Sequence, residues 1–131
     1  MAQGRECVNC IEFVVPGRPV PAVRMTSRGK WVKDRAQEYL SYKEQVGWAA
    51  RQAYCGLIRG PVRVEVLVFL KGRRAGDVDN YAKSILDGCN GVIWLDDQQV
   101  IELHVYRHTG RPERVEVRVT EIAERGASAD D

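Results

Sequence analysis

The sequence predicts one small α/β (α+β) domain, in which a mixed sheet carries two helices. Two patterns predict it: a long amphipathic stretch over residues 34–57 and, soon after it, a strand over residues 62–70 in which valines and a final leucine alternate with Arg63, Glu65, Leu67 and Phe69. A third observation sets the size, because 131 residues with 44% hydrophobic content can bury a single compact core. A long helix that leads into a strong strand is typical of mixed α/β architecture.

The two ends of the chain are expected to lie outside this domain, which should span residues 11–122. Residues 1–10 form an N-terminal extension, and residues 123–131 form an acidic tail whose composition predicts disorder. Cys7 and Cys10 have the spacing of half a zinc site, but neither a second pair nor neighbouring histidines complete it. We therefore expect ordinary thiols, with a metal or redox role as the open alternative.

No apolar run approaches the length of a membrane span, so we expect no membrane association. The first residues also lack the long apolar segment of a secretory signal. Cytoplasmic residence is the expectation that follows.

Taken in order, the first element is a short strand over residues 11–15 that ends at a Pro-Gly turn. Residues 17–34 are expected to form an extended basic arm, with a small hairpin whose turn lies at residues 27–30. This arm could touch a phosphate backbone, although a solvated basic loop fits the composition equally well. The basic residues that fit such a contact, interleaved with Trp31, are Arg24, Arg28, Lys30, Lys33 and Arg35.

The remaining elements follow from periodicity. Residues 34–57 predict the long helix, and the alternation over residues 62–70 predicts the strongest strand. A short helix over residues 80–87 should follow, and residues 100–106 and 115–122 should form two further strands.

Trp48 and Trp94 are expected in the core, because one falls on the long helix and the other in an apolar run. Trp31 lies in the basic arm and could stack on a base or sugar instead. Cys55 and Cys89 are expected to be small packing residues near helix ends. His104 and His108 are expected to be structural or surface residues.

A charged block follows the strongest strand. Asp77 and Asp79 are two residues apart, so in an extended connection their carboxylates would face the same way. Lys83 lies one helical turn beyond Asp79, and an apolar run later delivers Asp96 and Asp97. Oxygen ligands of this kind suit Mg²⁺. Helix capping or a solvated acidic turn explains the same residues without chemistry, and spacing alone leaves the two interpretations about even.

Positive charge surrounds this block. The formal net charge is only +2, but Lys71, Arg73 and Arg74 come directly before the first acidic pair. The planar fork of arginine suits phosphate groups, so this is a modest indication of nucleic-acid binding. A salt bridge from Lys83 to Asp79 or Asp87 is the structural alternative for that lysine.

The block GRRAGDVDNYAKSILDGCNGVIWLDDQQV resembles the RusA family of Holliday-junction resolvases. The family shows basic residues before Asp-x-Asp-Asn, a lysine on the next helix and a downstream Asp-Asp-x-Gln-Val. The resemblance extends over residues 11–122 and implies a homodimer that depends on Mg²⁺ or Mn²⁺ and nicks branched DNA, a four-way junction, at two symmetric positions.

The resemblance also assigns roles to residues. It implies that the metal ligands and catalytic carboxylates are Asp77, Asp79 and Asp97, and that Lys83 is the catalytic lysine. Contacts to DNA are expected from Lys71, Arg73, Arg74, Arg24, Arg28 and Lys30. Asn80 and Asp96 match motif positions without an assigned metal role.

Two alternatives remain. One is a DNA-binding module without catalysis, or a nuclease without junction specificity. The other is a different Asp-x-Asp enzyme, such as a phosphatase or a sugar-nucleotide transferase. The sequence disfavours the second, since it lacks a nucleophilic Asp followed by Gly-Thr and is short for the transferase fold.

Overall fold

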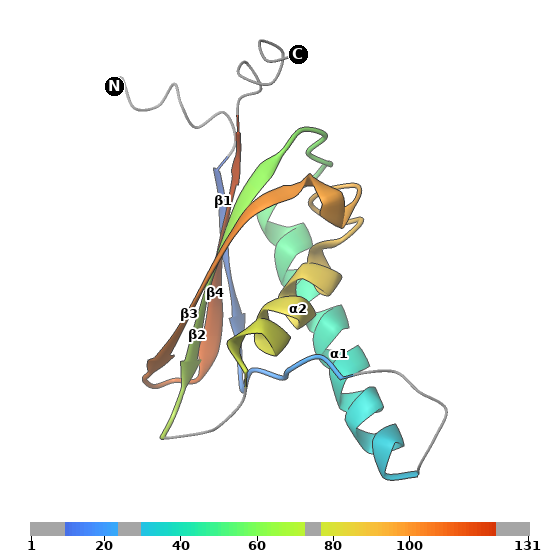
Figure 1. Ribbon diagram of the computed structural model, residues 1–131, viewed down its shortest axis with the longest axis vertical. Helices are drawn as coiled ribbons and strands as arrows, with labels where there is room; N and C mark the ends of the chain where they lie inside the picture. Colours follow the sequence, from blue (N-terminus) through green and yellow to red (C-terminus); the bar gives the residue numbers. More distant parts are fainter. Residues whose placement is uncertain (1–9, 24–29, 73–76, 123–131) are drawn as a thin grey trace.

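A four-stranded mixed sheet with two helices on one of its faces forms the protein, as the sequence predicts (Figure 1). The computed structural model describes residues 10–23, 30–72 and 77–122, with side chains of the first helix from residue 34 onward. The elements are β1 (Cys10–Pro16), α1 (Lys30–Ala53), β2 (Val62–Leu70), α2 (Val78–Cys89), the short 3₁₀ helix η2 (Asp97–Gln99), β3 (Val100–Thr109) and β4 (Arg114–Glu121).

The sheet has the order β1-β4-β2-β3. β4 pairs antiparallel with both β1 and β2, whereas β2 and β3 pair in parallel. Parallel neighbours need a long crossover connection, and α2 supplies it. The charged block therefore belongs to the β2–α2–β3 unit, with its first acids near the end of β2 and its last acids just before β3.

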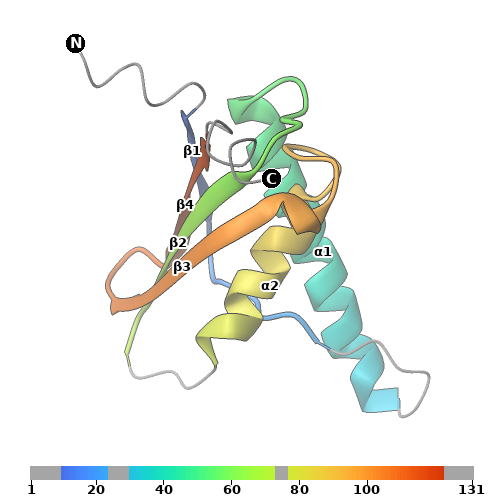
Figure 2. The same ribbon diagram turned by 45° about the horizontal axis from the view of Figure 1, so that its top comes forward.

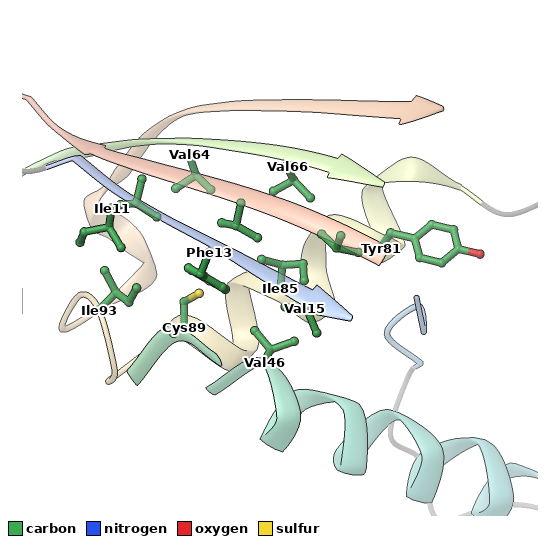
Figure 3. Close-up of a cluster of buried hydrophobic side chains, with 14 of the residues drawn as sticks. Ile11, Phe13, Val15, Val46, Val64, Val66, Tyr81, Ile85, Cys89 and Ile93 are labelled. Carbon is green, nitrogen blue, oxygen red and sulfur yellow. The ribbon is translucent and has the colours of Figure 1, made fainter. Parts of the chain in front are cut away.

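The core lies between the sheet and the helices, where alternate strand residues meet the apolar faces of α1 and α2 (Figure 3). Val64 and Val66 of β2 are fully buried, and Val46 of α1 and Ile85 of α2 meet them with no exposed surface of their own. Trp94 is also fully buried, which confirms its predicted place in the core.

The two helices approach each other closely at Gly88. A Cβ atom at that position would lie 2.6 Å from the Cβ of Val46, a distance that side chains do not tolerate. Nearby, the Tyr39 hydroxyl of α1 donates a short hydrogen bond to the Asp87 carboxylate of α2. A glycine contact and a polar contact thus fix α2 against α1.

The predicted strands are confirmed: both bounds of β2 agree, and the ends of the other strands differ by at most three residues. The predicted hairpin is wrong from residue 30 onward, because α1 already begins there. No glycine or proline interrupts residues 30–46, so the helix can extend into the basic segment. α2 is likewise longer than residues 80–87 and includes Gly88.

Two predicted core positions are wrong. Trp48 is 60% exposed, because its side of α1 faces away from the sheet, and Cys55 is exposed beyond the end of that helix. Cys89 is buried as expected. His104 and His108 are both at the surface, although His108 lies within β3 and not at a turn.

Several predictions concern residues outside the described ranges. They are the N-terminal extension with Cys7, the hairpin segment with Arg24 and Arg28, Arg73 and Arg74, the side chains of Lys30 and Trp31, and the tail from residue 123. Among the described residues, no helix is both long and apolar enough to cross a membrane.

Candidate active site

Asp77 and Asp79 lie at the start of α2. Asp77 occupies the N-cap position with an extended backbone, yet its side chain makes no capping hydrogen bond. Its main-chain carbonyl accepts from the N–H groups of Asn80 at 3.1 Å and Tyr81 at 3.4 Å. Capping therefore does not account for the Asp77 carboxylate, which is exposed and available to a ligand.

The expectation that Asp77 and Asp79 both lie in extended backbone is wrong. Asp77 has an extended backbone, but Asp79 already lies in the first turn of the helix. The positive end of the helix dipole favours negative charge at both positions. The two carboxylates thus lie at the start of α2, and neither side chain accepts a hydrogen bond that caps the helix.

The first part of the basic arm, up to residue 23, passes beside this turn. The main-chain N–H of Ala22 donates to the carbonyl of Asn80 at 3.0 Å, so the chain runs along the start of α2 on its way to residue 24 (Figure 1). Lys71 is exposed just after the end of β2, where its N–H donates to Glu113 Oε2 at 3.0 Å. The described residues therefore show that the arm passes the start of α2 at Ala22, and that Lys71 follows β2 in the segment that leads to Asp77.

Lys83 makes the structural salt bridge that the sequence offered as its alternative. Its Nζ lies 3.6 Å from Asp87 Oδ2, and the lysine side chain is 62% exposed. Burial, and then the hydrogen bond to Asp87, raises the pKa of Tyr39, so the phenol remains a donor to this carboxylate. An exposed ion pair contributes at most about 1 kcal/mol, so a phosphate group can compete with Asp87 for Lys83.

Asp97 lies at the opposite end of α2. Its Oδ1 accepts from Trp94 Nε1 at 2.9 Å, and Trp94 is bridged to Asn90, the C-cap of α2. Burial raises the pKa of the Cys89 thiol, and the nearby Asp97 charge adds to that effect. Figure 2 shows the start of β3 beside the C-terminal end of α2.

The length of α2 separates Asp97 from the first acidic pair. Twelve residues of α-helix extend about 18 Å, far beyond the span of one metal coordination sphere. Among the described residues, no three Asp, Glu, His or Cys side chains form a group that could hold a metal ion. One chain thus brings Asp77 and Asp79 to the same helix end, but it does not add Asp97.

The Asp96 side chain is hydrogen-bonded to the main chain. Its carboxylate accepts from the N–H of Gln98 at 3.1 Å and so caps η2, while Gln99 Oε1 accepts from the N–H of Asp96 at 3.0 Å. Gln99 Nε2 donates to the carbonyls of Ile58 and Gly60, both at 2.8 Å. Sequence reasoning missed the role of Gln99, although Asp-x-x-Gln is the signature of a capping box. This network fixes the turn that presents the neighbouring carboxylate.

A comparison with protein families shows to which family the chain is related. The model of the endodeoxyribonuclease RusA family matches residues 16–120, which is most of the chain. The chain belongs to the RusA endodeoxyribonuclease family. A relative, the uncharacterized protein YqaN of Bacillus subtilis (strain 168), is 30% identical over 142 residues, with 88% of this chain and 99% of the relative covered.

Membership of the RusA family confirms the resemblance seen in the sequence and identifies the class of activity, endonucleolytic cleavage of DNA. The matched range contains both acidic pairs, Lys83 and the whole basic arm. The range includes every element from α1 to β4 except the last residue of β4, and of β1 it includes only Pro16.

Proposed function

We propose that this protein is a divalent-metal-dependent endodeoxyribonuclease that resolves four-way DNA junctions as a homodimer, by paired symmetric nicks, in the cytoplasm. The observation that carries the proposal is the carboxylate pair at the start of α2, where Asp77 makes no capping hydrogen bond, in a chain of the RusA family. A four-way junction has near two-fold symmetry, and a two-fold dimer presents two sites to it.

Mg²⁺ or Mn²⁺ would bind at Asp77 and Asp79, with Asp97 as the third carboxylate. The donor set fits, because hard divalent cations prefer carboxylate oxygens and keep several positions for water and substrate phosphate. When bound, the cation polarises the scissile phosphate and acidifies water. The exposed Asp77 carboxylate, which no helix cap occupies, supports this assignment.

Asp97 requires a second chain in this proposal. It lies at the far end of α2 from Asp77, so a complete set within one chain would need a large rearrangement. In a two-fold dimer, Asp97 of each chain can instead complete the acidic pair of the other. The proposed homodimer then has two shared sites, each built from both chains.

The chain's own cations would bind the DNA. Lys83, held loosely by Asp87, would offset the charge that grows on the phosphoryl oxygens during hydrolysis. Lys71, Arg73 and Arg74 would hold the backbone near the cut. Contacts farther along the DNA would come from the arm residues, namely Arg24, Arg28 and Lys30.

Incubation of the protein with a synthetic four-way junction and with a linear duplex of the same sequence, with and without Mg²⁺, tests the proposal. We expect paired symmetric nicks in the junction alone, only with the metal, and their loss in Asp79→Asn. Asp34→Asn, which removes an exposed carboxylate of α1, is the matched control and should cleave normally.

Other results would point to the alternatives. Tight junction binding without metal-dependent nicks would indicate a DNA-binding module without catalysis. Equal cleavage of the junction and the duplex would indicate a nuclease without junction specificity, and either result would refute the resolvase.

A further inference from the structure

Lys83 lies on α2 between two aspartates, each one helical turn away from it. Asp79, of the acidic pair, is four residues before the lysine, and Asp87 is four residues after it. Both are at the spacing at which charged side chains meet on the surface of a helix. Lys83 pairs with Asp87, at 3.6 Å, and among the described residues Asp79 makes no ion pair.

This choice of partner opposes the intrinsic preference of a helix. Each Cα–Cβ bond tilts toward the N-terminus, so the side chain of a helical lysine leans toward the turn before it. An acid four residues before a lysine is accordingly a better partner than an acid four residues after it. An isolated α2 would therefore favour the pair of Lys83 with Asp79, and the observed pair has an additional cause.

That cause is Tyr39 of α1. Its hydroxyl donates the short hydrogen bond to Asp87 Oδ2, the same oxygen that lies 3.6 Å from Lys83 Nζ. Tyr39 is buried, and its raised pKa keeps the phenol protonated, so it continues to donate. The close approach of Gly88 to Val46 fixes the turn of α2 that carries Asp87. The carboxylate that binds Lys83 is thus held in place from α1.

The difference in exposure between the two aspartates favours the same pair. The Asp87 side chain is 22% exposed, whereas Asp79 is exposed at the start of the helix. Water and salt screen an exposed carboxylate more than a partly buried one, so Asp87 attracts Lys83 more strongly. Lys43 of α1 lines the same groove as Asp87, but its Nζ lies 5.9 Å from the centroid of the Tyr39 ring.

We propose that Tyr39 and Asp87 are positioning residues, a tether that holds Lys83 away from Asp79 so that the acidic pair stays open to a divalent cation. The inference rests on the metal site of the proposed function and adds to it a residue from each helix. Without Asp87, Lys83 would pair with Asp79, and its ammonium group would compete with the cation. With Asp87 present, the lysine stays one turn away until a DNA phosphate attracts it.

Calorimetric titration with Mn²⁺ in the absence of DNA, at about 0.15 M salt, tests the tether apart from cleavage. Binding that is lost in Asp79→Asn identifies the signal of the acidic pair. Asp87→Asn removes the charge that holds Lys83 but keeps an oxygen that can accept from Tyr39, so the fold should persist. Tyr39→Phe removes the anchor and leaves the charge of Asp87. Far-ultraviolet circular dichroism reports the folding of each variant.

We expect Asp87→Asn to weaken Mn²⁺ binding about two- to fivefold, the range over which an exposed ion pair can compete. The lost charge itself contributes little, because two turns of helix place Asp87 about 12 Å from Asp79, beyond the Debye length at this salt concentration. Tyr39→Phe should weaken binding less, since the carboxylate remains. Unchanged binding in Tyr39→Phe would refute the role of Tyr39.

The coupling between residues 83 and 87 separates a tether from a general effect of charge or stability. Lys83→Gln should leave Mn²⁺ binding near that of the wild type in the intact chain, yet restore it in the Asp87→Asn background. Lys43→Gln is the matched control, because it removes the other lysine that lines this groove and should restore nothing.

Two results would overturn the tether while the metal site of the proposed function stands: equal effects of Lys83→Gln in both backgrounds, or an Asp87→Asn variant that binds Mn²⁺ like the wild type. A wild type that binds no Mn²⁺ would overturn both. If the coupling is found but no junction is cut, the proposed function fails and the tether stands.

Discussion

Asp96 and Asp97 are adjacent carboxylates that the surrounding residues treat differently. The Asp96 carboxylate accepts a hydrogen bond from a main-chain N–H and caps η2, so it stabilises the fold. Asp97 accepts only a side-chain N–H in the described structure, that of the buried Trp94. The indole orients the second carboxylate and leaves it another oxygen for a ligand.

This difference predicts opposite effects of substitution. Asp96→Ala should lower the free energy of unfolding by about 1 kcal/mol through the lost cap, while cleavage at saturating DNA changes only a few-fold. Asp97→Asn keeps an acceptor for Trp94, so stability should be near that of the wild type, but cleavage should fall by roughly a hundredfold or more. Urea unfolding and single-turnover nicking rates measure the two effects. A stable, fully active Asp97→Asn variant would contradict the assignment of Asp97.

The cysteines should differ in reactivity. Burial, with a smaller contribution from Asp97, raises the pKa of the Cys89 thiol, so little thiolate forms and no reagent can reach it. Cys10 and Cys55 are exposed. Iodoacetamide at mildly alkaline pH should therefore modify Cys10 and Cys55 in the native protein, and Cys89 only after unfolding. Peptide mapping by mass spectrometry reads each site, and equal native labelling at Cys89 would disprove its burial.

At the level of elements, sequence periodicity was most informative where burial alternates strictly. Over β2 the alternation predicted both bounds of the strand, because one face of a strand packs under helices and the other does not. Trp48 was misplaced since the moderate apolar pattern of α1 does not say which side meets the sheet. The distance between Asp77 and Asp97 could not be predicted either, because it follows from the parallel crossover, in which α2 carries the chain back along the full length of β2.

The contact between α1 and α2 yields a prediction at this scale. Gly88→Ala would place a Cβ 2.6 Å from Val46, so the helices must separate and the free energy of unfolding should fall by about 1–3 kcal/mol. Gly47→Ala is the matched control, because its Cβ would lie 3.4 Å from the carbonyl oxygen of Gly88 and alanine favours the helix. Thermal unfolding of both variants measures the difference. Equal stability of the two would show that α2 can shift without cost.

For the whole molecule, the acidic residues pose a problem of assembly. A single chain has two of the proposed carboxylates at one end of α2 and another at the opposite end. In the homodimer of the proposed function, the carboxylates of each site would come from both chains. Within this family fold, dimerisation and assembly of the site would then be one event.

A mixture of two inactive variants tests this assembly. Asp79→Asn and Asp97→Asn chains, each inactive alone, would form mixed dimers in which one shared site has both substitutions and the other has neither. Random exchange should then restore about a quarter of the wild-type number of intact sites, because half of the dimers are mixed and each has one. Junctions should be nicked on one strand per binding event, which denaturing gels separate from paired cleavage. If each site were built within one chain, every site would carry a substitution and the mixture would stay inactive.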